Sequence, residues 1–440
     1  MDRADAALQA AVRLPTIAHA DPAQVDAAPF DALRAVLRAH FPLVHERLEL
    51  TRIDRHGLLF HWVGRTAERP VVLMAHLDVV PVDDSAPWRH PAFSADVVDG
   101  AMWGRGTLDD KGSVVAICEA IERLLETGFV PAQDIWLSFG ADEEVSGRCA
   151  PAAVSELRDR GVKPWFVLDE GGAIAGEAFP GVLPPVGVVG VTEKGTTTLV
   201  LTAEGRGGHA STPARNGPTV RVARAILRIE KAPFPASVPA PTVELLRRLA
   251  PHAPKALGAL MANAGRLGPA VARALIAAGP EPAAMTRTTV AVTTLSGSPA
   301  ANVIASSARA GLNIRVMVGD SVDGVVEHIR KAIRDRDIRI DVGDANEPSP
   351  VSPWAGDPAY DLIETTIAEV FPDAIPSPYV MMAATDSRFF TAICERVYRF
   401  APFRMSKEQR ASIHSYDEHI RLEDFHTGID WYRRLLEKVA

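Results

Sequence analysis

Two adjacent carboxylates, Asp109 and Asp110, stand in the glycine-rich stretch Trp103 to Gly112, directly before a run with helical periodicity from Ser113 to Glu126. Neighbouring carboxylates raise each other's pKa, so this arrangement is costly unless a positive group lies beside them. A divalent metal ion would supply that charge. For an isolated pair of this kind the competing interpretation is a solvated turn in which one aspartate caps the helix.

Further acidic and histidine residues follow three short apolar runs, 70–75, 134–140 and 165–168, each typical of a strand buried on both faces. Because helices alternate with these runs, we predict a doubly wound sheet, in which ligands bind at the carboxyl ends of the strands. The residues expected at that edge are His76, Asp78, Asp142, Glu143, Glu144, Asp169 and Glu170. His76 and Asp78 point to the same side of an extended segment, which suits a metal-binding imidazole and the carboxylate that orients it.

The chain has 440 residues and a formal net charge of −8, with no block of Lys and Arg. This predicts two domains and argues against a nucleic-acid partner. No apolar run is long enough to span a bilayer, and the first five residues are too acidic for a signal peptide, so we expect a cytoplasmic protein that does not contact membranes. Its three cysteines, Cys118, Cys149 and Cys394, are expected to be reduced packing residues.

The sequence pattern changes near residue 191, where half-exposed strands replace the fully apolar ones. A proline-rich break at 347–353 marks the return of the chain to the first domain. The predicted fold class is α/β: a catalytic domain with a doubly wound mixed sheet, formed by residues 1–190 plus 347–440, and an inserted smaller α+β domain, residues 191–346. Within the insertion, the Ala- and Leu-rich segment 243–278 is predicted to be helical in two or three pieces separated by prolines.

Six motifs, in this order, resemble those of the M20 family of dinuclear zinc peptidases and amidohydrolases, and they span nearly the whole chain. They are His76-Leu77-Asp78, Gly104 to Gly112, Asp142-Glu143-Glu144, Leu168 to Gly171, Gly208 to Ser211 and Ile413-His414. Within the family, Thr385 to Arg388, Tyr398 to Pro402 and the long insertion resemble the branch of carboxypeptidase S and the N-fatty-acyl-amino-acid hydrolases. That branch often has Asn-Glu after the last histidine, where this chain has Asp417-Glu418.

The resemblance implies two Zn²⁺ ions per subunit, for which Co²⁺ or Mn²⁺ are acceptable substitutes, with Asp109 bridging them. One ion would also bind His76 and Asp169, and the other Glu144 and His414. Asp78 would orient His76, Glu143 would be the general base, and the Asp109–Asp110 peptide bond is expected to be cis. Two metals about 3.5–4 Å apart activate water and polarise the scissile carbonyl, while a free carboxylate moves the proton.

Three residues of the insertion receive roles only through the resemblance. His209 would stabilise the oxyanion from the neighbouring subunit, which predicts a homodimer joined through the inserted lid domain. Asn302 and Arg315 would hold the free carboxylate of the substrate. Without the resemblance, His209 is a loop histidine and Arg315 a solvated charge on the open face of a one-sided sheet.

The predicted function is therefore zinc-dependent hydrolysis of an amide bond next to a free carboxylate, in a peptide or an N-acyl amino acid. The acyl side stays open, since segment 243–278 suits either an apolar channel for a fatty-acyl chain or simple packing in the lid. The alternative from another class is a metal-binding ligand sensor without hydrolytic activity. Such a protein would be expected to lose the base or a ligand, whereas this chain keeps Glu143 and all five ligands.

Overall fold

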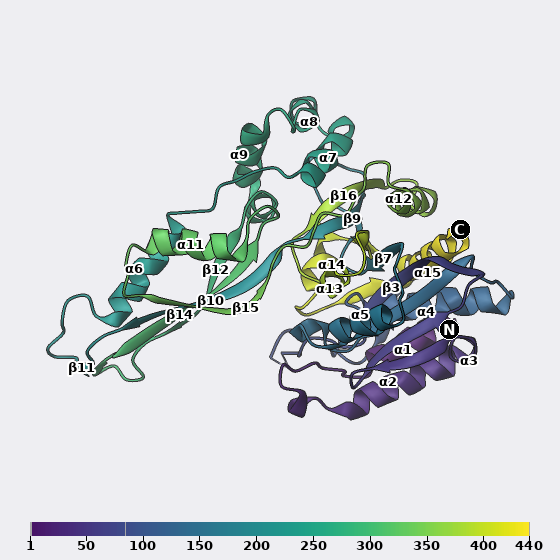
Figure 1. Ribbon diagram of the computed structural model, residues 1–440, viewed down its shortest axis with the longest axis horizontal. Coiled ribbons are helices and arrows are strands. Elements are labelled where there is room, and N and C mark those ends of the chain that lie inside the picture. Colours follow the sequence, from purple (N-terminus) through teal and green to yellow (C-terminus); the bar gives the residue numbers. More distant parts are fainter. Residues whose placement is uncertain (1, 84, 440) are drawn as a thin grey trace.

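The computed structural model describes residues 2–83 and 85–439 and divides into a large α/β body and an elongated lid (Figure 1). The body is built on a ten-stranded mixed sheet with the order β1-β2-β6-β3-β7-β17-β9-β8-β18, to which β16 is added beside β9. The two chain ends both lie in the body (Figure 1).

The strands of this sheet are β1 (Glu49–Ile53), β2 (Gly57–Trp62), β3 (Thr66–His76), β6 (Gln133–Gly140), β7 (Phe166–Asp169), β8 (Ala173–Ala175), β9 (Val186–Glu193), β16 (Ile375–Met381), β17 (Val397–Arg399) and β18 (Arg404–Met405). A small separate sheet holds β4 (Asp96–Val98), β5 (Ala101–Trp103) and β19 (His419–Arg421). In the parallel centre, β3 pairs with both β6 and β7, and His76 is in register with Gly140. The carboxyl ends of these strands therefore meet at one edge.

Helices cover both faces of the large sheet, which confirms the predicted doubly wound α/β fold. One face packs under α1 (Arg3–Val12), α2 (Ala27–His40), α3 (Pro42–Arg47), α4 (Lys111–Glu126), α12 (Pro358–Val370) and α15 (Leu422–Lys438), and the other under α5 (Cys149–Asp159) and α13 (Ser387–Phe390). Helix α14 (Lys407–Ser412) precedes the loop that carries His414. The stretch 71–75 of β3 is apolar and fully buried, as expected for a central strand that is covered on both faces.

The lid is built on an antiparallel sheet with the order β12-β14-β10-β15. Its elements are β10 (Gly195–Glu204), β11 (Gly208–His209), α6 (Pro218–Glu230), β12 (Thr289–Ser296), β13 (Val303–Ile304), β14 (Ser307–Val316), α11 (Val322–Ile333) and β15 (Arg339–Asn346). Helices α6 and α11 bury one face of this sheet, and alternate residues of β14 such as Leu312 and Ile314 form its core. The outer strands β12 and β15 are largely exposed.

The chain passes from the large sheet to the lid sheet at Lys194, the single residue between β9 and β10. It returns directly after β15, which ends at Asn346. The two crossing segments are held together, because Glu193 N donates to Ser349 Oγ at 2.9 Å and Ser349 N donates to the Glu193 carbonyl at 3.2 Å. The connection is therefore a paired, hydrogen-bonded hinge.

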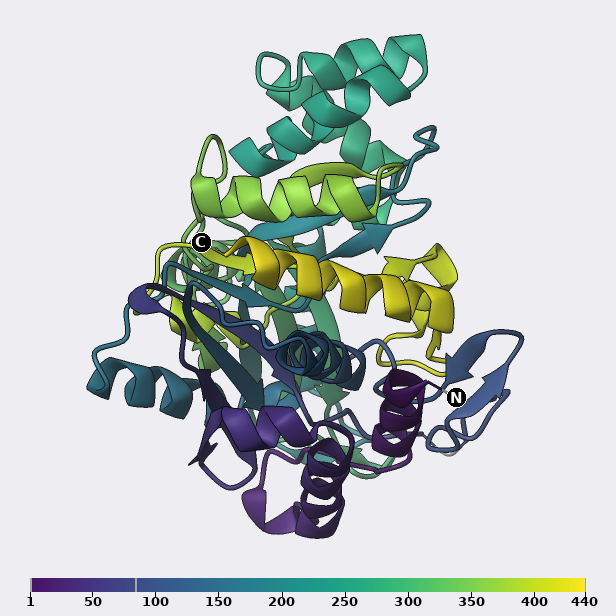
Figure 2. The same cartoon turned by 90° about the vertical axis from the view of Figure 1, so that its right-hand side faces the viewer.

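The Ala- and Leu-rich segment folds into α7 (Ala240–Leu249), α8 (Lys255–Ala262), α9 (Gly268–Ala278) and the short α10 (Pro280–Ala284). Its buried residues, among them Leu245 and Leu249, pack with Val182 and Val186 of the large sheet and its β8–β9 connection. These helices stand at one end of the molecule, coloured teal at the top of Figure 2. They are absent from the cluster that forms the described core of the lid, so the interpretation of this segment as lid core is wrong.

Helix α1 ends at Val12, and Pro15 follows three residues later. Proline disfavours the helical conformation of the residue before it. Across residues 2–83 and 85–439, no helix has both the length and the apolar character that a membrane span requires. All three cysteines are buried and unpaired.

Candidate metal centre

Four of the five predicted metal ligands meet at the carboxyl edge of the large sheet. His76 ends β3, Asp109 lies in the turn before α4, Glu144 lies in the short helical turn Glu143–Val145 after β6, and His414 follows α14. His76 Nε2 is 2.9 Å from Asp109 Oδ1, and His414 Nε2 is 2.9 Å from Asp109 Oδ2. Asp109 thus offers one carboxylate oxygen to each histidine, which is the geometry required of a bridging ligand.

The second side of the centre is completed by Glu144, whose Oε2 is 3.0 Å from His414 Nε2. Its other oxygen, Oε1, is buried and has no hydrogen-bond partner among the described residues. One ligand atom each of His76, Asp109 and Glu144 lies within 4.8 Å of the others. An unpartnered buried oxygen beside imidazole nitrogens and carboxylates fits divalent zinc, cobalt or manganese.

The turn that carries these acids has the predicted cis peptide bond between Asp109 and Asp110. His414 has a φ of 60°, in the left-handed region that residues other than glycine seldom adopt. A backbone held in this conformation at a candidate site indicates that the loop is shaped to aim the imidazole.

Asp78 is fully buried and orients both halves of the site. His76 Nδ1 lies 3.1 Å from the backbone carbonyl of Asp78 and 3.4 Å from its Oδ1, and the two carboxylate oxygens accept the backbone N–H groups of Glu143 at 3.3 Å and Glu144 at 3.1 Å. The His76 ring is therefore held with Nε2 toward Asp109, and the Glu143-Glu144 turn is held against the same carboxylate.

Asp169 ends β7 at the same edge, but its two oxygens are engaged by backbone groups. Oδ1 accepts Glu170 N at 2.9 Å and Oδ2 accepts Ser387 N at 2.8 Å. A carboxylate oxygen has more than one lone pair, so these bonds leave capacity for a metal and fix the orientation of the side chain. The structure thus places Asp169 at the edge, where the described residues give it no hydrogen bond or ion pair with His76.

The charges at the centre are strongly coupled. Hydrogen bonds with Asp109 and Glu144 raise the pKa of His414 to about 10. Burial opposes protonation of His76, yet its hydrogen bonds with Asp109 and Asp78 raise its pKa well above the usual value. Burial alone would raise the pKa of Asp109, but the two histidines lower it. Protonated imidazoles thus occupy the positive role that divalent ions would take, and metal binding must release protons.

Glu143, like Glu170 at the same edge, has a carboxylate that is not bound to the other acids. Within the described chain neither carboxylate has a hydrogen-bond partner, and Glu143 lines the cavity beside Asp109 and His414. Burial raises its pKa well above the usual value. A free carboxylate with a raised pKa next to the metal ligands can accept and return a proton, as a general base must.

Glu418 was named from the sequence only as part of the Asp417-Glu418 pair and was given no role; it is fully buried beneath the Asp109 turn. Its Oε1 accepts backbone N–H groups from Gly106, Leu108 and Asp109 at 3.0, 2.9 and 3.2 Å, and its Oε2 accepts Arg105 Nη1 at 2.7 Å. This one carboxylate links the turn of Asp109 to the loop of His414. The sequence signals were the Asp417-Glu418 pair itself and the spacing of four residues from His414 to Glu418.

A second missed group connects the hinge to the metal edge. Glu193 Oε2 accepts Thr385 N at 3.1 Å, Thr385 Oγ1 at 3.0 Å and Arg399 Nε at 3.1 Å. Thr385 Oγ1 lies 2.6 Å from Ser387 Oγ, and Ser387 N binds Asp169. A fully buried ion pair at the hinge is therefore three contacts away from a predicted metal ligand.

The lid residues lie at two opposite ends of the lid sheet. His209 is exposed on β11, at the end of the lid farthest from the body in Figure 1, and Asn302 is beside it because its carbonyl accepts Ala210 N at 3.1 Å. Arg315 pairs with Thr196 at the hinge end, whereas the distal end of β10 pairs Glu204 with Ser307. Eight residues of strand separate these two positions by roughly 27 Å. One chain does not bring Asn302 and Arg315 onto the same carboxylate.

The guanidinium of Arg315 has no hydrogen-bond or ion-pair partner in the described chain, and burial lowers its pKa. The neighbouring Lys194 is almost fully buried and donates from Nζ to the Arg287 carbonyl at 2.8 Å. Burial, together with the charge of Arg315, lowers the pKa of Lys194 to about 8. This cationic region at the hinge suits an anionic group of a ligand.

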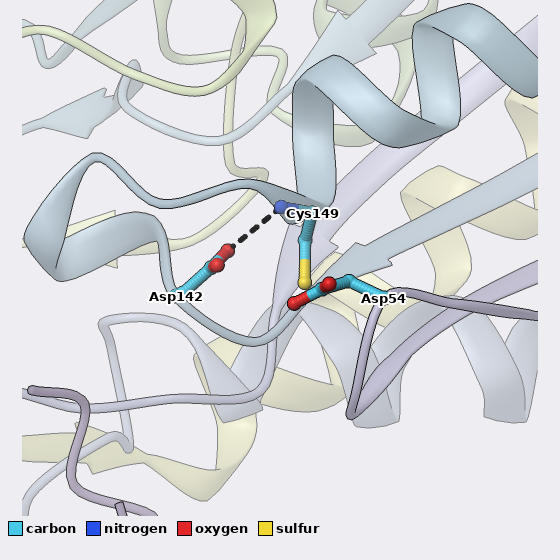
Figure 3. A group of neighbouring side chains, drawn as sticks. All are labelled: Asp54, Asp142 and Cys149. Carbon is cyan, nitrogen blue, oxygen red and sulfur yellow. Dashed lines mark hydrogen bonds between the residues drawn. The ribbon is translucent and has the colours of Figure 1, made fainter. Parts of the chain in front are cut away.

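Asp54, Asp142 and Cys149 form another group of metal-ligating residue types near the site (Figure 3). Asp142 accepts Cys149 N at 3.1 Å, drawn as the dashed line, and Arg148 N at 2.7 Å. Gly147 approaches so closely that a Cβ there would lie 2.0 Å from the Asp142 carboxyl carbon. These contacts show that the cluster stabilises the turn that follows Glu144.

Comparison with known proteins gives a consistent picture. Residues 72–438 match the peptidase family M20/M25/M40. The chain is 34% identical over 410 residues to a probable carboxypeptidase S-like 2 of Dictyostelium discoideum, covering 91% of this chain and 78% of that protein. It is 34% identical over 390 residues to the N-fatty-acyl-amino acid synthase/hydrolase PM20D1 of Homo sapiens, covering 88% and 77%.

Among solved structures, the M20 family metallo-carboxypeptidase Sso-CP2 from Sulfolobus solfataricus has the same fold, with a TM-score of 0.72 at 17% identity and 99% coverage of both chains. Human carnosine dipeptidase 1 gives a TM-score of 0.67 at 15% identity, covering 98% of this chain and 94% of that one.

Proposed function

The chain belongs to the peptidase family M20/M25/M40 and is a metal-dependent hydrolase of amide bonds, and from that premise we propose that it cleaves an amide next to a free carboxylate, in an N-acyl amino acid or a peptide. The observation that carries this proposal is the Asp109 carboxylate shared between His76 and His414, with the unpartnered carboxylate of Glu143 beside it.

We propose that the centre holds two zinc ions, one on His76, Asp109 and Asp169 and the other on Asp109, Glu144 and His414. The nitrogen and oxygen donors suit zinc, and Co²⁺ or Mn²⁺ also fit them. When bound, the ions would supply Lewis acidity toward water and toward the scissile carbonyl. Asp78 would keep the His76 tautomer with Nδ1–H toward the Asp78 oxygens.

The proton steps belong to Glu143 in this proposal. Its carboxylate oxygen takes a proton from the attacking water and then delivers it to the nitrogen of the leaving amine. The raised pKa of Glu143 favours the first of these transfers, since a carboxylate with an ordinary pKa is a weaker base and accepts the proton of water less readily. The amine side of the substrate would extend toward the hinge, where the unpartnered guanidinium of Arg315 can bind its carboxylate through two hydrogen bonds.

We also propose a homodimer joined through the lid. Within one chain, His209 and Asn302 lie beyond the distal end of the lid sheet, and that end is roughly 27 Å along the strands from Arg315, so they would reach a substrate held by Arg315 only from a partner subunit. The exposed edge strands carry apolar side chains, among them Val292, Leu295 and Val342. Exposed apolar positions on sheet edges favour association.

A subunit-mixing experiment tests the dimer. Inactive Glu143→Gln and His209→Ala proteins are combined under conditions that allow exchange. If His209 acts in trans, mixed dimers have one intact site, and random pairing recovers up to about a quarter of wild-type activity. No recovery after demonstrated exchange, or a monomer in sedimentation, contradicts the trans assignment and leaves the metal centre unaffected.

The second candidate narrows the substrate to N-fatty-acyl amino acids. It is favoured by the human relative named above and by the N-fatty-acyl-amino acid synthase/hydrolase PM20D1.1 of Danio rerio, which is 32% identical over 436 residues. The carboxypeptidase S of Saccharomyces cerevisiae, 28% identical over 468 residues, favours peptides instead.

The decisive experiment is hydrolysis of matched N-acyl amino acids and dipeptides by the zinc-loaded protein, each with a free or an amidated carboxyl terminus. Glu143→Gln is the control for contaminating activity. Turnover that requires Glu143 and a free carboxylate supports the proposal. Binding of these compounds without any turnover would favour the ligand-sensor alternative. A cytoplasmic location stays a prediction, supported by the unpaired state of the three cysteines.

A further inference from the structure

A cavity of about 790 Å³ runs from the metal centre to the helices inserted at 240–284. Asp109, Glu143 and His414 line it at the metal end, and Ala278, Pro282 and Met285 line it at the helical end. Phe179 and Val182 of the β8–β9 connection form the opposite wall. We call this space the apolar chamber.

The side chains of the chamber away from the metals are mainly alanine, valine, aromatic and methionine residues. Four of the nine methionines of the chain line it, namely Met285, Met381, Met382 and Met405. Methionine is unbranched and flexible, so such a lining adapts to apolar ligands of differing shape. Glu177, Glu281 and Lys407 also contribute, and all three, like Ala278, are exposed and so lie at the rim of the chamber.

The remaining cation of the lining, Arg410, is committed to the protein. Its Nη1 donates to the Gly176 carbonyl at 2.8 Å and to the Met405 carbonyl at 2.7 Å. Arg315 does not line the chamber, and neither does any strand of the described lid sheet. A substrate with its carboxylate on Arg315 and its scissile bond at the metals would therefore place its acyl side in the chamber.

We propose that the apolar chamber is the acyl-chain subsite of this hydrolase, that it takes a linear aliphatic chain, and that Ala278 of α9 and Ala178 of the facing loop limit the chain length. The inference rests on the proposed hydrolysis of N-acyl amino acids. At roughly 30 Å³ for a group the size of a water molecule, which a methylene resembles, the chamber has room for well over ten carbons. The inserted helices thereby become part of substrate recognition.

The test measures kcat/KM of the zinc-loaded enzyme for one amino acid acylated with chains of two, six, ten and fourteen carbons, below their micelle concentrations. Burial of each methylene is expected to raise kcat/KM about fourfold, equivalent to ~0.8 kcal/mol, until the chamber is full. Ala278→Trp should then lower kcat/KM for the longest chains at least tenfold and leave the acetyl substrate within twofold of wild type.

The matched control is Ala277→Trp. Ala277 is the neighbouring exposed alanine in the same last turn of α9, but it does not line the chamber. Ala178→Trp reduces the length of the chamber from the facing wall. Comparison of the two variants therefore distinguishes a loss of chamber space from a disturbance of helix α9. Both Ala278→Trp and Ala178→Trp are expected to move the optimum to shorter chains, and Ala277→Trp is expected to leave it unchanged.

Three results would overturn the inference. Rates that do not depend on acyl length in the wild type would show that the chamber does not hold the chain. A preference for an N-succinyl over an N-hexanoyl substrate would show that Arg410 binds the distal carboxylate of the acyl group and that the chamber does not select an aliphatic chain. If kcat/KM depends on the amino-acid side chain of the substrate, and Ala278→Trp changes only that dependence, the apolar chamber holds the amine side of the substrate. Absence of Glu143-dependent hydrolysis of every N-acyl amino acid, acetyl included, would instead refute the proposed function itself.

Discussion

Replacing Glu418 by glutamine is expected to weaken metal binding, although Glu418 touches no metal. The side chain is buried, and it holds the turn of Asp109 through three backbone N–H groups and Arg105 through its second oxygen. Glutamine keeps the shape and one accepting oxygen, but it loses the charge and turns an NH₂ group toward Arg105. The bridging aspartate would then sit on a turn that is less firmly placed.

The size of the effect follows from these contacts. A hydrogen bond to a charged group contributes about 1.5–3 kcal/mol and one between neutral groups about 1 kcal/mol. Loss of charge therefore weakens the three backbone bonds by ~1 kcal/mol each, or ~3 kcal/mol together, before the unpaired Arg105 is considered. Because metal binds only the ordered turn, the dissociation constant should rise by about 10- to 100-fold, the range found for groups that support metal ligands.

The assay is competition for Zn²⁺ or Co²⁺ against a chromophoric chelator, with kcat measured at saturating metal. Glu408→Gln is the matched control, because Glu408 lies on the same segment but is exposed and, among the described residues, its carboxylate pairs with Arg89 alone, at 3.4 Å. An exposed pair of this kind contributes little, so the control should match wild type. If Glu418→Gln binds metal as tightly as Glu408→Gln, within twofold, the inferred support of Asp109 is wrong.

Four further outcomes are expected. Glu143→Gln should keep both metals and lose turnover by at least 10²-fold, because it removes proton transfer and keeps the shape; loss of a metal equivalent in elemental analysis would contradict this. Arg315→Ala should raise KM about 10- to 100-fold for substrates with a free carboxylate and much less for their amides, and equal effects would make Arg315 structural. Glu193→Ala should lower the free energy of unfolding by about 3–5 kcal/mol by leaving Arg399 buried without its partner, measured by denaturant titration. In metal-free protein, protonated His414 contributes its full stabilisation of the fold below pH 6.5, its ordinary pKa, and this contribution is lost as the pH rises through about 10. With metal present the pH dependence is opposite, because the ion binds only the deprotonated imidazole, so the affinity for the metal should rise with pH.

The fold of the body was largely predictable because its central strands are short apolar runs, each of which is followed by acidic or histidine residues. The runs that end at His76, Gly140 and Asp169 became neighbouring parallel strands, so the acids and the histidine that follow them share one edge. The inserted helices were predicted in pieces, but their packing was not. Helical periodicity shows that a face will be buried, yet it does not specify whether the lid or the large sheet covers it.

Residue type and local spacing determined which side chains could bind metal in this protein: Asp109 before a helix, His76 two residues from Asp78, and the Glu143-Glu144 pair after a strand. Only the tertiary structure decided what supports and separates them. Glu418 reaches the Asp109 turn across more than three hundred residues of chain, Glu193 pairs with Arg399 at the hinge, and Asn302 and Arg315 lie at opposite ends of one sheet. Such contacts depend on strand register and on the path of the chain between distant segments. A local sequence motif depends only on positions that are close in the chain, so these long-range contacts cannot be predicted from it.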